Sequence, residues 1–197
     1  EQYRFNRAEL LEWATARRIP ISPEIFREEE SEAASLPDFA EALRAGGVHY
    51  RIGGHDKAGV LHAVVDSMRL PAEVDRPFLY EVLLAREALG STGIGDGIAI
   101  PHVRNPVILH LERPLITLCF LERAVDFGAL DGQPVDTLFT LISPTVRAHL
   151  HLLSRLSFAL RDPAFRQTVL GQAAREESLT AAERADRERS RAMAARS

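Results

Sequence analysis

The feature that most constrains the fold is a set of short apolar and β-branched runs separated by turn-forming residues. Three such runs occupy residues 98–100, 115–121 and 135–142. Runs of this length and composition are typical of strands buried within a sheet. A fourth segment, residues 48–52, alternates apolar and polar side chains and also predicts a strand.

Helical patterns lie between these predicted strands. Apolar residues at 60, 61, 64, 65 and 68 recur at helical spacing, and residues 77–89 repeat that pattern. Ser143 and Pro144 are the residue types preferred at the N-cap and first position of a helix, which we expect to run to about Arg161. Leu150, Leu153, Leu156 and Leu160 would form its core face. The alternation predicts one α/β domain.

The chain divides into four zones on composition. Residues 36–172 form the α/β domain, with an opening helix near 38–45 and a last short helix ending near Leu170. Residues 1–20 carry a short strand–helix extension, and residues 21–35 form an acidic linker. Residues 173–197 are rich in arginine and glutamate, and their apolar residues are too sparse for a core-facing stripe. We therefore expect a charged helical or disordered tail there.

Composition narrows the class of protein. With 46% hydrophobic and 26% charged residues, the chain has a globular profile, and its apolar runs are too short to span a membrane. A net charge of −4 argues against a general nucleic-acid binder. The lone Cys119 excludes an intramolecular disulfide and reads as a buried strand residue. No charged-then-apolar leader opens the sequence, so we expect a cytoplasmic location.

The segment from Gly90 to His102 is the strongest candidate for chemistry. Four of the eight residues from Gly90 to Gly97 are glycine, and His102 follows directly behind Pro101. Successive amides in such a loop can bind an anion such as phosphate. A hairpin turn at Gly95-Asp96-Gly97, with the histidine at a strand end, explains the same residues equally well. A neutral imidazole has a free lone pair and is a reasonable phosphate acceptor.

A second candidate is His149, in the predicted helix after Ser143. A partly buried structural histidine is the plainer interpretation of this residue. His149 and His151 are about 200° apart on a helix and cannot share one metal ion. The remaining histidines have no Cys or acidic partner at zinc-site spacing, so we predict no metal site. Nothing in the sequence calls for another cofactor.

The motif from Arg86-Glu87 through Gly90-Ser-Thr-Gly-Ile-Gly-Asp-Gly-Ile-Ala-Ile-Pro-His102 resembles the active-site signature of type-2 EIIA domains. These domains belong to the bacterial phosphoenolpyruvate:sugar phosphotransferase system, in its fructose, mannitol and nitrogen-regulatory classes. Residues 127–136, 141–144 and 149–156 resemble later segments of the family in the same order. The resemblance spans roughly residues 36–172 and implies a mixed central sheet flanked by helices.

The resemblance implies that His102 is the phosphorylated residue, with a phosphoryl group received from an HPr-type carrier protein. It implies that His149 and Arg86 assist at the catalytic site. The phosphate-binding loop would consist of Ser91, Thr92, Gly93 and Gly95. Asp96 departs from the family, which more often has asparagine there. Its negative charge would oppose phosphorylation unless it points away or pairs with Arg86 or Arg104.

Residues 3–13 resemble the end of an excisionase-like winged helix-turn-helix domain whose recognition helix is absent from this sequence. DNA would then be bound only through that missing part. Three functions follow as alternatives: a regulatory phosphocarrier of the nitrogen branch, a sugar-specific EIIA that passes phosphate to an EIIB, and a non-catalytic DNA-binding regulator with an EIIA-like sensor. Regulatory target proteins and a homodimer are further expected partners, and membrane insertion is not expected.

Overall fold

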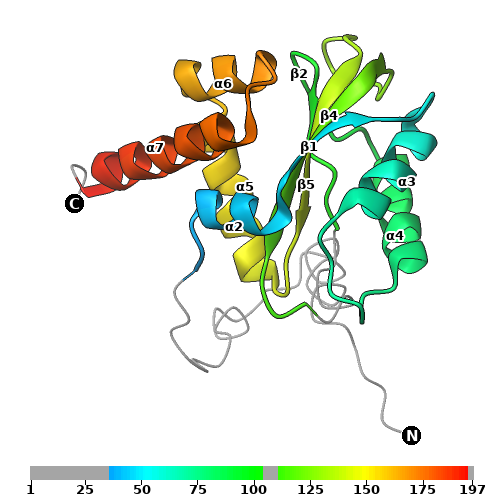
Figure 1. Cartoon of the computed structure of the whole chain (residues 1–197), viewed down its shortest axis with the longest axis horizontal. Helices are drawn as coiled ribbons and strands as arrows, with labels where there is room; N and C mark the ends of the chain where they lie inside the picture. The colour runs from blue at the N-terminus through cyan, green and yellow to red at the C-terminus, as the bar shows by residue number, and fades with distance from the viewer. Residues whose placement is uncertain (1–35, 104–110, 195–197) are drawn as a thin grey trace, which may run out of the picture. The chain divides into compact units, whose positions relative to one another are not determined.

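The computed structural model describes residues 36–103 and 111–194 of the chain. The predicted strand–helix extension at 1–20, its likeness to a DNA-binding domain and the acidic linker at 21–35 lie outside the described residues. Within the described part, helices cover both faces of one central sheet (Figure 1). None of these helices is both long and apolar enough to cross a membrane.

The sheet has five strands in the order β1-β4-β5-β3-β2. Their bounds are β1 Val48–Ile52, β2 Gly93–Gly95, β3 Ile98–Ala99, β4 Leu115–Val125 and β5 Val135–Ile142. β1 pairs with β4 and β3 pairs with β5 in parallel, whereas the β4–β5 and β2–β3 pairs are antiparallel. The expected mixed sheet is therefore confirmed.

The helices divide between the two faces of the sheet (Figure 1). α3 (Lys57–Ser67) and α4 (Arg76–Ala88) lie on one side, and α2 (Phe39–Gly46), α5 (Val146–Ala159), α6 (Pro163–Leu170) and α7 (Arg175–Ala194) lie on the other. The central strands alternate accordingly. In β4, Ile116, Leu118 and Phe120 face the second group, while Leu115, Cys119 and Leu121 face the first. This two-sided burial explains the nearly continuous apolar runs.

Two details of α5 differ from the sequence-based expectation. Its N-cap is Thr145, whose hydroxyl accepts a hydrogen bond from Ala148 N at 3.1 Å, and not Ser143. The core face of the helix includes Leu152, Leu156 and Leu160, and Leu153 packs against it, whereas Leu150 is 60% exposed. The predicted core face was therefore wrong at Leu150. His149 is buried on this helix.

The charged segment after residue 172 is helical over residues 175–194, which was one of its two predicted forms, but the expectation that it lacks a core-facing stripe was wrong. These residues form α7, and Leu179, Ala182 and Ala185 are buried in the core shared with α2, α5 and α6. Two of these three buried residues are alanines, so the apolar face of α7 is narrow. The sequence of the segment is therefore mostly polar. Core packing thus extends beyond the predicted boundary at 172.

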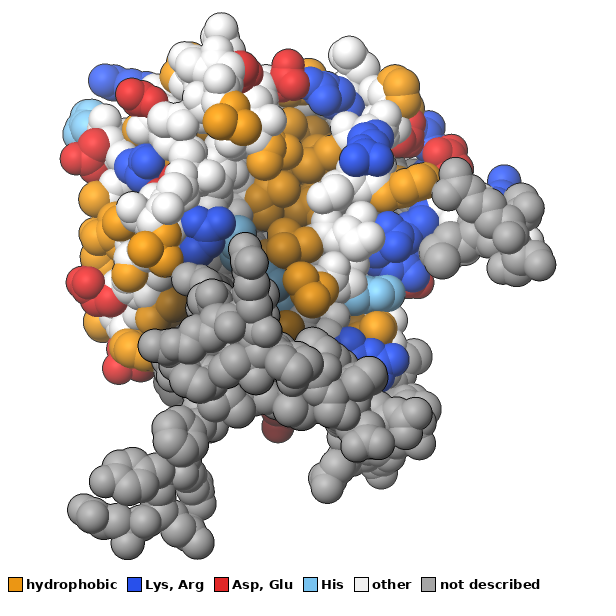
Figure 2. Space-filling model, turned by 180° about the vertical axis from the view of Figure 1, so that it is seen from behind, with side chains coloured by type: hydrophobic (Ala, Val, Ile, Leu, Met, Phe, Trp, Pro, Cys, Tyr) orange, Lys and Arg blue, Asp and Glu red, His pale blue; other side chains and the backbone are white. Residues whose placement is uncertain are grey.

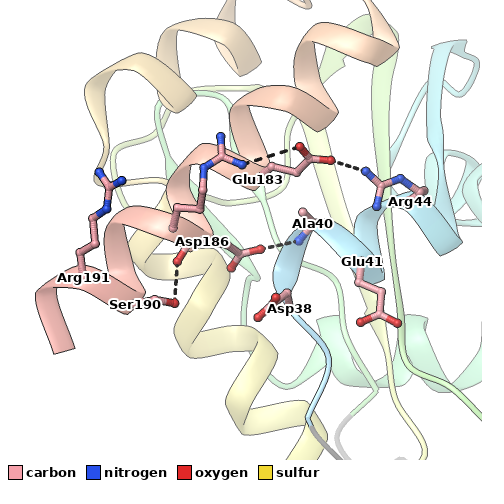
Figure 3. Close-up of a pocket in the computed structure, with 9 residues that line it drawn as sticks. Asp38, Ala40, Glu41, Arg44, Glu183, Asp186, Ser190 and Arg191 are labelled. Carbon is pink, nitrogen blue, oxygen red and sulfur yellow. Dashed lines mark hydrogen bonds and ion pairs between the residues drawn. The ribbon is translucent and has the colours of Figure 1, made fainter. Parts of the chain in front are cut away.

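Asp186 of α7 caps the start of α2. Asp38, the N-cap of α2, makes no side-chain capping bond, and the Asp186 carboxylate accepts hydrogen bonds from Phe39 N and Ala40 N instead (Figure 3). Asp186 also pairs with Arg155 of α5 at 2.7 Å, and Arg155 pairs with Asp38 at 2.9 Å. This network fixes α2 and α5 to α7.

Candidate functional site

His102 lies where the chain leaves β3 and continues beside β5. Pro101 O accepts a hydrogen bond from Leu141 N at 3.0 Å, and His102 itself forms a parallel bridge to Leu141. The ring nitrogen Nδ1 is 2.8 Å from Ile100 O. A carbonyl can only accept, so Nδ1 carries the proton and Nε2 keeps its lone pair. The backbone therefore selects which nitrogen is free to act as a nucleophile.

Arg86 reaches His102 from α4. Asp75 caps the start of this helix by accepting from Phe78 N at 2.9 Å, and Arg86 falls in its last turn. Arg86 Nε donates to His102 Nε2 at 3.3 Å, and its Nη1 donates to Gly90 O at 3.0 Å. The guanidinium is thus held at the lone pair of His102 by a second bond to the glycine loop.

His149 completes the group from α5. The two imidazole rings lie with centroids 5.2 Å apart and are inclined by 43°. His149 is buried, and its Nδ1 has no hydrogen-bond partner among the described residues. The expected convergence of His102, His149 and Arg86 is therefore present, although the three residues come from three different elements of the fold.

Burial and positive neighbours keep both rings neutral. Burial is the main cause that lowers the pKa of His102, with Arg86 adding to it, while the Ile100 carbonyl opposes the shift. The pKa of His149 falls to about 4 through burial, His102 and Arg86. Near pH 7 the site therefore has one fixed positive charge, on Arg86, and two uncharged imidazoles. Such a site can attract an anion while keeping a nucleophilic lone pair.

The glycine-rich segment forms a hairpin, which is one of the two structures that its sequence predicts. β2 and β3 pair antiparallel, and the two residues between them, Asp96 and Gly97, both have positive φ (52° and 75°). Positive φ at both central positions is what a tight two-residue hairpin requires. The hairpin and phosphate-binding interpretations are compatible, because the hairpin leads directly to His102.

Several amides of the predicted phosphate loop are already bonded within the chain. Thr92 N donates to the Glu87 carboxylate at 3.0 Å, and Gly93 N donates to Ser91 Oγ at 3.0 Å. Thr92, Gly93 and Gly95 are buried. The assignment of Ser91, Thr92, Gly93 and Gly95 to phosphate binding stays a prediction, and these bonds show that the loop is internally fixed.

The Asp96 carboxylate pairs with Arg166 of α6. It does not pair with Arg86, and Arg104 lies outside the described residues. Its side chain is 60% exposed, so its charge is compensated at the surface and screened by water.

The sequence analysis missed Glu87 and Lys57. Glu87 is 4% exposed and binds Thr92 and Lys57. Two signals were available: Glu87 directly follows Arg86 in the motif, and Lys57 is the only lysine of the chain. Neither could be interpreted without the tertiary contact between α3 and α4.

A groove of about 360 Å³ lies elsewhere, between α2 and α7 (Figure 3). Arg44 and Glu183 pair across it, and Asp186 is bonded to Ala40. Its lining does not include His102, His149 or Arg86. No group of three metal-ligating side chains occurs in the described ranges 36–103 and 111–194. The histidine pair is therefore the stronger candidate site.

Comparison with known proteins finds relatives of this chain. Residues 42–182 match the family described as phosphoenolpyruvate-dependent sugar phosphotransferase system, EIIA 2. A nitrogen regulatory protein of Pseudomonas aeruginosa is 40% identical over 124 residues, which are 61% of this chain and 78% of that protein. A fructose-specific EIIABC component of Bacillus subtilis is 34% identical over 134 residues, 66% of this chain and 20% of that protein.

The match spans only about half the length of other nitrogen regulatory proteins, such as those of Bradyrhizobium diazoefficiens and Escherichia coli (54% and 56%). Among solved structures, the nitrogen regulatory protein IIA-Ntr of Neisseria meningitidis superposes with a TM-score of 0.60 at 25% identity. The superposition covers 69% of this chain and 92% of that one.

Proposed function

Because this chain belongs to the EIIA type-2 family of the phosphoenolpyruvate-dependent sugar phosphotransferase system, we propose that it is a phosphocarrier that accepts a phosphoryl group on His102. The proposal rests on which nitrogen of the His102 ring carries the proton. Nδ1 is tied to Ile100 O, so Nε2 offers its lone pair beside the Arg86 guanidinium.

The transfer would proceed in line from the phosphohistidine of an HPr-type carrier. His102 Nε2 forms the new N–P bond as the N–P bond of the carrier breaks, and the carrier nitrogen regains its lone pair. Arg86 Nε–H, which now donates to Nε2, would turn to an oxygen of the incoming phosphoryl group. His149 would donate a ring N–H to the same group. Positioned donors of this kind stabilise the spread negative charge of the transition state.

Docking of a protein carrier requires a surface around the histidines. Leu89, Ile94 and Leu150 are 72%, 51% and 60% exposed, and they adjoin Arg86, the glycine-rich hairpin and His149 in sequence. Figure 2 displays a face on which hydrophobic side chains gather in a hollow next to histidine side chains. Exposed apolar patches of this kind mark protein-binding sites more often than chance.

We assign the chain to the regulatory branch, because a nitrogen regulatory protein is 40% identical to it. The second candidate is a sugar-specific EIIA that passes phosphate to an EIIB, favoured by the 34% identity to a fructose-specific component. Both functions use the same chemistry at His102 and differ in the protein that receives the phosphoryl group.

The test is phosphoryl transfer from phosphoenolpyruvate through Enzyme I and an HPr-type carrier to this chain. Two carriers are compared, one from the sugar branch and one from the nitrogen-regulatory branch. We expect acid-labile, alkali-stable label on the wild type and none on His102→Ala. His62→Ala is the matched control, since His62 is an exposed histidine of α3 that pairs with Asp66. Label that persists on His102→Ala, or no label on the wild type with either carrier branch, would contradict the proposal. The faster of the two carriers identifies the branch.

A further inference from the structure

Lys57 is the only lysine of the chain, and it begins α3 directly after its N-cap, Asp56. Its Nζ lies 3.3 Å from Glu87 Oε1 and 5.5 Å from the centre of the Phe127 ring. The lysine side chain is 31% exposed, whereas the Glu87 side chain is 1% exposed. A single surface-reaching cation thus compensates a buried carboxylate.

Glu87 connects this cation to the segment that leads to His102. Its carboxylate accepts hydrogen bonds from Thr92 N at 3.0 Å and from Thr92 Oγ1 at 2.6 Å. The carbonyl of Thr92 then accepts from Ile100 N at 3.0 Å. Ile100 O is the group that binds His102 Nδ1. An unbroken series of polar contacts therefore joins Lys57 to the ring of His102.

Glu87 also follows Arg86 in the last turn of α4. Movement of its carboxylate would change the anchor of the Thr92 segment. A buried carboxylate is stable only when it is paired and fully hydrogen-bonded. Removing the charge of Lys57 would leave the Glu87 carboxylate buried without its cation, which weakens the arrangement that holds Thr92.

We propose that Lys57 is a positioning residue for phosphoryl transfer, acting through Glu87 to hold Thr92 and the His102 segment in register. The inference rests on the proposed function, since it concerns the same site. It adds a residue from α3, outside the motif that carries His102. Within the described part of the chain, Lys57 contacts Glu87 and Phe127 rather than His102, so its effect is on geometry.

The test compares Lys57→Met, which removes the charge, with Lys57→Arg, which keeps it. Small displacements of reacting groups cost about tenfold or more in rate. We therefore expect Lys57→Met to lower kcat for phosphoryl transfer about tenfold with KM for the phosphorylated carrier nearly unchanged. Lys57→Arg should retain at least about half of the rate, because the guanidinium can still pair with the carboxylate.

The measured fraction of folded protein separates positioning from a general loss of stability. We expect Lys57→Met to remain folded by circular dichroism while its kcat falls, whereas a variant that is merely less stable would lose transfer in proportion to its unfolded fraction. Arg184→Met is the matched control: it removes another partly exposed cation from an ion pair with a mostly buried carboxylate, Asp162, and should leave kcat unchanged.

Hydrogen exchange at the Thr92 amide tests the contacts without any transfer. We expect slow exchange in the wild type and Lys57→Arg, and clearly faster exchange in Lys57→Met. A wild-type transfer rate and wild-type exchange at the Thr92 amide in Lys57→Met would overturn this inference while the proposed function stands. If the wild type itself takes no phosphate from any carrier, the proposed function fails and this inference fails with it, whatever the exchange shows.

Discussion

Lowering the pH from 7.5 to 5 should weaken the domain by about 2 kcal/mol through His149 alone. Burial, His102 and Arg86 lower the pKa of this imidazole from 6.5 to about 4 in the folded protein. Between these two values the unfolded chain binds a proton at His149 and the folded protein does not. The free energy of unfolding therefore falls as the pH falls through this window.

The magnitude follows from the size of the shift. Each pKa unit corresponds to about 1.4 kcal/mol, so the full effect approaches about 3 kcal/mol near pH 4. At pH 5 most of it has developed, and at pH 7.5 almost none. Urea unfolding followed by circular dichroism at pH 7.5, 6 and 5 measures it.

His149→Gln removes the titrating ring and should remove this component of the pH dependence. The stability difference between wild type and His149→Gln should therefore shift by about 2 kcal/mol against the wild type between pH 7.5 and pH 5. His62→Gln, at an exposed site, should follow the wild type. Direct NMR titration of the His149 ring gives an independent check. Equal pH dependence in wild type and His149→Gln would refute the reasoning.

Two further substitutions test the fold and the hairpin. Gly46→Ala would place a Cβ 2.2 Å from Ile116 O, and because that neighbour is backbone we expect a loss of about 3 kcal/mol in urea unfolding; a loss under about 1 kcal/mol would show that α2 can move off β4 easily. Asp96→Asn removes an exposed ion pair but keeps a residue type that tolerates positive φ, so stability should change by less than about 1 kcal/mol. The rate of phosphoryl transfer to His102 should also stay within about twofold, and a larger gain would mean that the Asp96 charge does oppose phosphorylation.

The sheet was largely predictable because burial on two faces leaves a clear mark on the sequence. The strands at 48–52 and 135–142 were predicted with the bounds that the structure gives them, and Cys119 is buried as expected. Local capping was less certain, since Ser143 and Thr145 are both good N-cap residues. The structure caps the helix at Thr145, and no local feature of the sequence distinguishes the two candidates.

The candidate site was also predictable only in part. His102, His149 and Arg86 were predicted from the motif and from family resemblance. The partners that set their chemistry were not, because the Ile100 carbonyl, Glu87 and Lys57 act through contacts that depend on how α3, α4 and β3 pack. The pairing of Asp96 with Arg166 likewise joins residues 70 positions apart, which spacing rules cannot reach.

The cap that Asp186 supplies to α2 has a consequence for the order of events during synthesis. The amide of Ala40, near the start of the domain, meets its carboxylate partner 146 residues later. The first turn of α2 therefore lacks this cap until α7 has been made, although α2 can already pack against β4. Contacts this distant along the chain are slow to form, so the capping of α2 is a late step in the folding of the domain.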